Sequence, residues 1–309
     1  MSARSLKGVC VKKEVSSKAI ALDPNLAEGY KALGNVYFYK GWMRKALEVQ
    51  LKAVELNPNY ANVVGNMGNT YGQIGNLEEA LRWTKKNVAL NPTNAYPYYL
   101  IGGVYYYLDD FVKAEYFYKK SLELQPDFTF AYQGLTDLYI AQGNCQKAIE
   151  EGQHLLSIDP DSSQNLIYAG EAEFFCTNYE RAKPYYQKAL AVPSPHALIP
   201  LGYILWKEGQ KQEARKLFNQ SLTILNKRLD EGNENPRLPF QIARIYNIQG
   251  DKAEAYKRLQ KAIDGGWLQY RLALTDPLLE NLRNEAKFQE MMTQVKVRVD
   301  EMRNRAEKE

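Results

Sequence analysis

The sequence predicts an all-α solenoid built from repeated pairs of helices. The stretch from Ala27 to Tyr60 recurs downstream, and prolines that close successive copies stand 34 residues apart. These prolines are Pro24, Pro58, Pro92, Pro126 and Pro160. Within each copy, apolar residues fall at helical spacing over two runs of about a dozen residues. A constant period with two amphipathic runs predicts that each copy folds as one pair of helices.

Small residues recur at fixed positions where the two helices of a pair should meet. In the first helices these are Gly34, Gly68, Gly102 and Gly170. In the second helices they are Ala46, Ala80, Ala114, Ala148, Ala182, Ala214 and Ala255. A bulky side chain at such a contact would force the helices apart, at a cost of about 1 to 3 kcal/mol. The pattern therefore predicts closely packed helix pairs.

The first helix of most copies is followed by a glycine, which can adopt the left-handed conformation that ends helices. These glycines are Gly41, Gly75, Gly143, Gly209 and Gly250. Asp109 takes this place in the third copy, and aspartate tolerates the same conformation. We therefore predict a helix end at each of these residues.

Taken together, these positions resemble the tetratricopeptide repeat (TPR) family. The family pattern of an aromatic residue, Leu-Gly, a tyrosine, two alanines and a proline is carried by Tyr30, Leu33, Gly34, Tyr37, Ala46, Ala53 and Pro58. The resemblance extends from about Val11 to Asp264. It implies a right-handed superhelix whose concave groove holds partner proteins.

The predicted superhelix has about seven helix pairs, an N-terminal half-repeat helix and a C-terminal capping helix. The expected division is 1–26 for the half-repeat, 27–266 for the array and 267–309 for the cap. The repeats are expected near 27–60, 61–94, 95–128, 129–162, 163–194, 195–235 and 236–266. The half-repeat is either a cap or a sign that the chain is a piece of a longer protein. In the sixth copy the second helix is expected to continue through Leu225 toward Leu229.

The chain after the last repeat resembles the end of TPR regions in bacterial adenylate cyclases and winged-helix regulators. The residues that carry this resemblance are Gly266, Trp267, Asp276, Pro277, Leu279, Leu282, Arg283 and Phe288. The resemblance implies an alternative function, as the regulatory segment of a larger signalling protein. A helix expected from Asn284 to Arg305 could also mediate self-association by filling the groove of a neighbouring copy.

Composition and cysteine usage narrow the classes of partner. The formal net charge of +4 is small and evenly spread, which argues against nucleic acid as a partner. Cys10, Cys145 and Cys176 form no C-x-x-C pair, and their odd number favours a reducing compartment. No apolar run is long enough for a membrane span or a secretion signal. We therefore expect a cytoplasmic protein that has no membrane partner.

The sequence offers no constellation typical of catalysis or metal binding. The two histidines, His154 and His196, lie in different copies without ligand spacing around them. Asp109 and Asp110 at a turn are expected to be solvated charges. We predict a non-enzyme with no catalytic residue, no metal site and no cofactor.

The TPR resemblance implies that the first helix of each copy lines the concave groove. The residues expected there in the middle copies are Tyr96, Tyr99, Tyr106, Tyr107, Phe130, Asp137, Glu171, Phe174, Phe175, Tyr203 and Trp206. Large exposed aromatic surfaces in proteins usually have a use, and aromatic side chains often anchor interfaces. The carboxylates favour a peptide or protein ligand that has Lys or Arg near an apolar anchor. Packing of these aromatics against one another is the alternative.

At the N-terminal end, Lys31, Asn35 and Asn66 match three positions of the clamp with which some chaperone-binding TPR proteins hold a terminal carboxylate. Tyr96 and Leu100 occupy the two basic positions of that clamp, so a carboxylate would be poorly held. We expect these residues to belong to the groove without forming a working clamp. The predicted function is a non-catalytic scaffold for protein binding.

Overall fold

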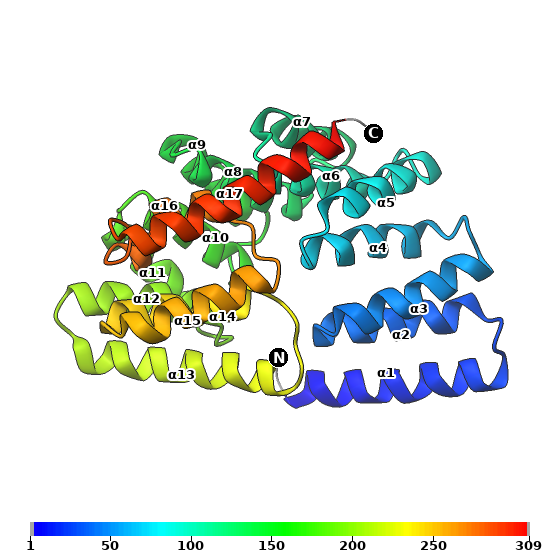
Figure 1. Ribbon diagram of the computed structural model, residues 1–309, viewed down its shortest axis with the longest axis horizontal. Coiled ribbons are helices and arrows are strands. Elements are labelled where there is room, and N and C mark those ends of the chain that lie inside the picture. The colour runs from blue at the N-terminus through cyan, green and yellow to red at the C-terminus, as the bar shows by residue number, and fades with distance from the viewer. Residues whose placement is uncertain (1–2, 308–309) are drawn as a thin grey trace.

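A computed structural model describes residues 3–307 of the chain, which form α-helices, one short 3-10 helix and no strand. Seven helix pairs follow one another in chain order (Figure 1). They are α2 (Ala27–Lys40) with α3 (Met43–Leu56), α4 (Ala61–Gln73) with α5 (Leu77–Leu90), α6 (Ala95–Tyr107) with α7 (Phe111–Leu124), α8 (Thr129–Ala141) with α9 (Cys145–Ile158), α10 (Ser163–Phe175) with α11 (Tyr179–Ala189), α12 (Pro195–Lys207) with α13 (Lys211–Asp230), and α14 (Arg237–Gln249) with α15 (Lys252–Asp264). The predicted all-α superhelix of seven helix pairs is confirmed.

The two ends of the array also form helices. The N-terminal helix α1 (Ala3–Leu22) begins before the predicted Val11 and packs on α2. The C-terminal part forms α16 (Tyr270–Thr275), η1 (Pro277–Leu279) and α17 (Ala286–Ala306). Residues 1, 2, 308 and 309 of the predicted terminal segments lie outside the described range.

The helix ends follow the prediction closely. All five predicted glycines have φ between 70° and 88°, and Asp109 has φ 60°. Thr177, the corresponding residue of the fifth copy, has φ 62°, although a β-branched residue is unfavourable there. Helix α13 ends at Asp230, which confirms its predicted extension past Leu225. The residues at the end of each first helix therefore determine the local backbone conformation separately in each copy.

Glycines allow close packing where a large side chain approaches a neighbouring backbone. The Tyr118 ring lies between α6 and α8, and a Cβ atom added at Gly102 or Gly134 would stand 2.6 Å from it. Both glycines are therefore required for this buried tyrosine to fit between successive repeats.

The superhelix curves until its C-terminal part meets the early repeats, so the chain closes into a ring (Figure 1). One apolar core joins α5 and α6 to α14, α15 and the C-terminal segment. Its members include Leu77, Leu81, Ile101, Leu108, Phe240, Leu259, Trp267, Phe288, Met291, Val295 and Val299. We call the contact between the C-terminal part and the first three repeats the seam.

Polar contacts reinforce the seam beside the first repeat. The Glu234 backbone N–H donates to the Gly41 carbonyl at 2.9 Å. The Trp42 indole N–H donates to the Glu231 carbonyl at 2.8 Å. A Cβ atom at Gly75 would lie 2.6 Å from the Gly266 carbonyl oxygen, so two backbones meet there in direct contact.

The third repeat contributes a carboxylate to the seam. Asp109 accepts hydrogen bonds from the Tyr270 hydroxyl and from Arg271 Nε, the latter at 2.7 Å. Its side chain is only 7% exposed, so the expectation of a solvated charge at Asp109 was wrong. Arg305 Nε contacts Glu78 Oε1 at 2.6 Å and ties α17 to α5. The left-handed Asp109 thus ends a helix and binds the C-terminal segment.

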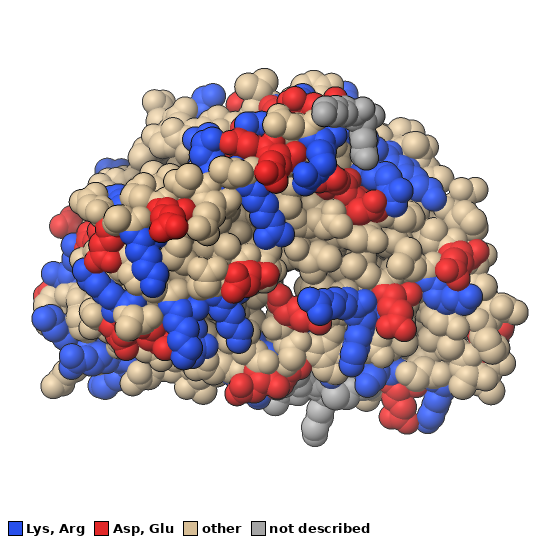
Figure 2. Space-filling view, viewed as in Figure 1, with Lys and Arg blue, Asp and Glu red and all other residues tan. Residues whose placement is uncertain are grey.

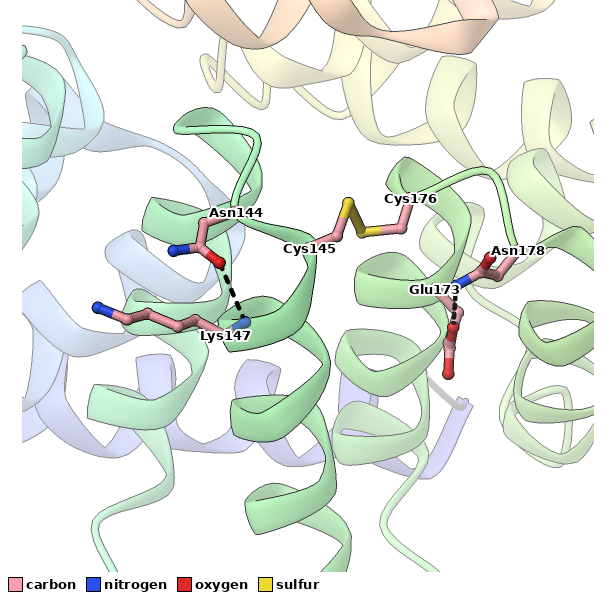
Figure 3. The surroundings of a disulfide bond; sticks show 6 residues. All are labelled: Asn144, Cys145, Lys147, Glu173, Cys176 and Asn178. Atoms are coloured by element: carbon pink, nitrogen blue, oxygen red, sulfur yellow. Dashed lines mark hydrogen bonds between the residues drawn. A yellow bond between two sulfur atoms is a disulfide. The ribbon is translucent and has the colours of Figure 1, made fainter.

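Cys145 and Cys176 form a disulfide between the fourth and fifth repeats, with their Cα atoms 5.6 Å apart (Figure 3). The corresponding residues two junctions earlier, Leu77 and Leu108, are both buried in the apolar core. The disulfide does not support the argument from an odd cysteine count to a reducing compartment, which stays a prediction, because disulfides are typical of oxidising compartments. No helix in the described range has the length and apolar character needed to cross a membrane.

Candidate functional site

The ring surrounds two adjoining cavities that are open to solvent and share part of their lining. Tyr106, Asp137, Tyr168 and Arg237 line both of them. The first cavity is also lined by Ile140, Gln164, Ile167, Glu171, Phe175, His196, Phe240, Gln241, Arg244, Gln269 and Leu272. The second is also lined by Gly68, Asn69, Gly72, Gln73, Tyr99, Leu100, Gly103, Val104, Tyr107, Tyr118 and Gly134. We call these two cavities together the chamber.

Two opposing walls form the chamber. The first helices of repeats three to five, α6, α8 and α10, supply one wall, and α14 with residues 269–272 supplies the other. Asp137 and Glu171 are 34 residues apart and occupy the same repeat position. Successive repeats therefore place two carboxylates on the same wall.

Asp137 lies between the two cavities. Within residues 3–307 it has no hydrogen-bond or ion-pair partner among the protein side chains. Removal from water and, to a lesser extent, the charge of Glu171 raise the pKa of its carboxyl to about 7, although Arg237 opposes the shift. Arg237 itself donates to the Tyr107 hydroxyl and lies 5.8 Å from the centre of that ring.

Glu171 lies at the other end of the acidic wall, near His196 and Gln241. His196 Nδ1 is 3.8 Å from Glu171 Oε1, and His196 Nε2 is 3.2 Å from Gln241 Nε2. Gln241 is 5% exposed, and its Oε1 has no hydrogen-bond partner in the part of the chain that the structure describes. A buried acceptor without a partner is uncommon in native proteins.

Arg244 is the second cation on the C-terminal wall. Its Nε lies 2.9 Å from Oδ2 of Asp276, a residue with no exposed surface. Asp276 Oδ1 also accepts from the Leu278 backbone N–H at 3.0 Å. Asp276 therefore neutralises the charge of Arg244, and the chamber keeps two carboxylates against the single guanidinium of Arg237.

Six of the predicted groove residues line the chamber, namely Tyr99, Tyr106, Tyr107, Asp137, Glu171 and Phe175. Phe174 and Tyr203 were wrongly assigned to the groove, because they are 0% and 2% exposed and their ring centres lie 5.6 Å apart in the core. Phe175 lines the chamber, whereas its neighbour Phe174 packs in the core. Trp206 packs near Phe218, outside the chamber lining.

Phe130 and Tyr96 belong to a separate aromatic cluster. Phe130 lies 5.7 Å from Tyr99 and 6.4 Å from Tyr96 between ring centres, and it is 46% exposed. This cluster borders the chamber only through Tyr99. Both alternatives of the sequence analysis therefore occur, since some groove aromatics line a cavity and others pack on one another.

The three residues that match a carboxylate clamp do come together, in a hollow of about 530 Å³ with Tyr96. Asn66 donates to Asn35 Oδ1 at 2.8 Å, and Lys31 Nζ lies 5.4 Å from the centre of the Tyr60 ring. Lys31 is the one charged residue among the described residues that line this hollow. A single ammonium group is a weak basis for holding a carboxylate.

The C-terminal wall was missed in the sequence analysis. Arg237, Phe240 and Arg244 occupy in the seventh copy the positions of Glu28, Lys31 and Asn35 in the first. Extending the comparison of groove positions to the seventh copy would have found them. Gln269 and Leu272 lie beyond the repeats, where no periodic signal exists.

Other chemistry is sparse in the described part of the chain. Residues 11–307, whose side chains the structure describes, contain no group of three or more His, Cys, Asp or Glu side chains that could hold a metal ion. The chamber lining combines polar and aromatic side chains.

Family models place the chain among known repeats. A model described as a tetratricopeptide repeat matches residues 27–60, 95–128 and 195–224, and a second TPR model matches residues 49–82. The chain therefore contains tetratricopeptide repeats. A comparison with curated proteins found no match. The TPR assignment rests on the repeats, and nothing in the comparisons supports the resemblance of the C-terminal end to adenylate cyclases or winged-helix regulators.

Solved structures share the fold of this TPR protein. A TPR protein from Parabacteroides merdae ATCC 43184 is 17% identical with a TM-score of 0.58, and the match covers 84% of this chain and 94% of that one. The APC/C hetero-tetramer Cut9-Hcn1 is 14% identical with a TM-score of 0.60 over 95% of this chain and 58% of that one. The human IFIT1 dimer with PPP-AAAA is 15% identical with a TM-score of 0.59 over 82% and 67%. At these identities the likeness concerns the fold alone.

Proposed function

We propose that this TPR protein is a non-catalytic scaffold that binds a segment of a partner protein in its chamber. One observation carries the proposal, namely the unpaired Asp137 carboxylate between the aromatic walls formed by Tyr106 and Tyr168. Concave sites with mostly apolar walls and a few convergent polar groups are typical of ligand binding. TPR proteins generally act as protein-binding scaffolds.

Ring closure limits the shape of the partner. The C-terminal wall covers part of the concave surface, so a bulky partner domain cannot lie along the whole groove. Figure 2 shows a narrow opening near the centre of one face of the ring. We therefore propose an extended peptide segment or a single inserted side chain as the occupant.

Self-association through the C-terminal helix is not part of this proposal. The apolar face of α17, including Met291, Val295 and Val299, is buried in the core of the same chain. Self-association through this face would require α17 to detach from the ring. The predicted cytoplasmic location stays a prediction, and the disulfide removes the cysteine argument for it.

The alternative function, a regulatory segment of a larger bacterial signalling protein, rests only on the C-terminal resemblance. Several of those residues have a structural task in this fold. The Trp267 ring stacks on Phe240 with 4.5 Å between ring centres, and Asp276 pairs with Arg244. A reading frame that continues upstream into a cyclase or winged-helix domain would support the alternative.

Filling the chamber tests the proposed scaffold. Gly103 lines the chamber, and a Cβ atom added there meets only the Tyr118 hydroxyl, at 3.8 Å. We expect Gly103→Leu to abolish partner capture from a lysate of the source cell, measured by mass spectrometry. A leucine in place of a helical glycine also favours the helix by about 0.5 to 1 kcal/mol, so the melting temperature should not fall.

Ala89→Leu is the control, because it also introduces a leucine side chain but does so on the exposed face of α5. We expect this variant to capture the same partners as the wild type. Equal capture by Gly103→Leu and Ala89→Leu would show that partners bind elsewhere on the protein.

A further inference from the structure

Three residues that carry side-chain oxygen acceptors, each from a different helix, line the first cavity of the chamber. Asp137 comes from α8, Glu171 from α10 and Gln241 from α14. Although the repeat places the two carboxylates on one wall, Gln241 reaches the same cavity only because the ring closes. The site is thus assembled by the fold from both walls.

The cations nearby leave these acceptors available. Arg244 pairs with the fully buried Asp276, and Arg237 donates to the Tyr107 hydroxyl. Neither guanidinium forms a hydrogen bond with Asp137 or Glu171 in the described range, and Gln241 Oε1 also lacks a partner there. A buried acceptor that stays unpaired costs about 1 to 3 kcal/mol, which a ligand with N–H groups would recover.

Aromatic side chains complete the site. Tyr106, Tyr168 and Phe175 line the same cavity as the carboxylates. Aromatic faces attract organic cations, and a charge is accommodated away from water only when it is paired and hydrogen-bonded. A carboxylate or phosphate ligand would instead face two like charges.

We infer that this part of the chamber binds the guanidinium or ammonium group of an arginine or lysine side chain. This inference rests on the proposed function, since it names the side chain that the partner segment inserts. Glu171 and Asp137 neutralise the cation, Gln241 Oε1 accepts one of its N–H groups, and the aromatic rings cover its apolar stem.

Binding of small capped amino acids to the full-length chain tests the inference. The probes are N-acetyl, N-methylamide derivatives of arginine, lysine, citrulline and glutamate, titrated by calorimetry or by NMR. We expect the arginine or the lysine probe to bind with a dissociation constant on the order of 1 mM. Citrulline, which is neutral but similar in shape to arginine, should bind at least ten times more weakly, and glutamate weaker still.

Variants then locate the site. Glu171→Gln and Asp137→Asn preserve shape and should each weaken binding of the cationic probe about fivefold to tenfold. Glu180→Gln removes a carboxylate from the exposed surface of α11 and should leave binding unchanged. Gln241→Met removes the unpaired acceptor, so it should weaken binding while the melting temperature stays equal or rises.

The outcomes separate the inference from the proposed function. Equal binding of citrulline and arginine, or tighter binding of glutamate, would overturn the cation site. If Gly103→Leu nevertheless abolished partner capture, the proposal of a protein-binding scaffold would stand, and only the proposal of a cation site would fail. Cation binding that is lost in Glu171→Gln, combined with capture that is indifferent to Gly103→Leu, would support the site and overturn the proposed function.

Discussion

Two kinds of contact hold this ring together, and they are built differently. Junctions between successive repeats reuse the same positions, as where Tyr118 packs between Gly102 and Gly134. The seam joins residues 130 or more positions apart, such as Tyr107 with Arg237 and Asp109 with Arg271. The comparison teaches that the junctions determine the helix pairs, whereas the seam creates the second wall of the chamber. Each prediction below acts on one kind of contact.

The largest effect is expected at the junction between repeats four and five. Replacing both Cys145 and Cys176 by serine removes a cross-link between residues 31 positions apart. We expect a loss of about 2 to 4 kcal/mol in the free energy of unfolding, because the unfolded chain regains conformational freedom. Thermal melting with and without dithiothreitol provides the measurement. Reduction should lower the melting temperature of the wild type to that of the variant, and a wild type insensitive to reduction would contradict the cross-link.

The next largest loss of stability is expected at a glycine of the seam. We compare two glycines with left-handed backbone conformation, one at the seam and one at an ordinary turn. An added Cβ atom at Gly75 would lie 2.6 Å from the Gly266 carbonyl oxygen, whereas Gly143 has nothing within 4 Å. Gly143→Ala should cost about 1 kcal/mol, from backbone conformation alone. Gly75→Ala should cost about 1 to 2 kcal/mol more, because two backbones must separate. Equal losses in denaturant unfolding would show that the seam adds little stability.

A smaller loss is expected when the seam loses its carboxylate. Asp109→Asn keeps the size and the left-handed tendency of the residue but removes the charge that binds Arg271. We expect a loss of about 1 to 2 kcal/mol in the free energy of unfolding. Asp230→Asn, at an exposed helix end, is the control and should be neutral. Proteolysis near α16 should also accelerate in Asp109→Asn if the C-terminal segment loosens.

The smallest effect depends on pH and concerns the chamber between the two walls. The pKa of Asp137 is raised to about 7, so the folded chain binds a proton that the unfolded chain releases near pH 4. The free energy of unfolding should therefore fall as pH rises from about 4 to 7. We expect a loss of only about 1 kcal/mol, because water that reaches the chamber screens the charge. Asp137→Asn should remove this loss and exceed the wild type in stability at pH 8.

Several groups face Asp137 and shape this titration. They are Tyr99, Tyr106 and Tyr107 on α6, Tyr118 on α7, Tyr168 and Glu171 on α10, and Arg237 on α14. Melting curves of the wild type and of Asp137→Asn at pH 5 and pH 8 provide the comparison. If the wild type were instead more stable than Asp137→Asn at pH 8, the charge of Arg237 would dominate and the Asp137 carboxylate would be ionised at both pH values.

Much of the fold was predictable from the sequence because each repeat encodes its own geometry. The helix ends at Gly41 and Asp109 and the long α13 all follow from local residue types. The adjacency of Asp137 and Glu171 also follows, since both occupy one repeat position. Phe174 failed as a groove residue because its ring packs in the core against Tyr203, a contact between neighbouring repeats that the groove positions alone do not reveal.

The sequence by itself determined the repeats, the helix pairs and the acidic wall, because those contacts lie within one or two periods of the chain. Only the tertiary structure decided where the ring closes, that Cys145 meets Cys176, and that Arg237 and Gln241 face the acidic wall. The physical reason is that the geometry of every junction contributes to the position of the ends. Small rotations between neighbouring repeats add up over the array, so the meeting point of its two ends is a property of all the junctions together and of no single residue.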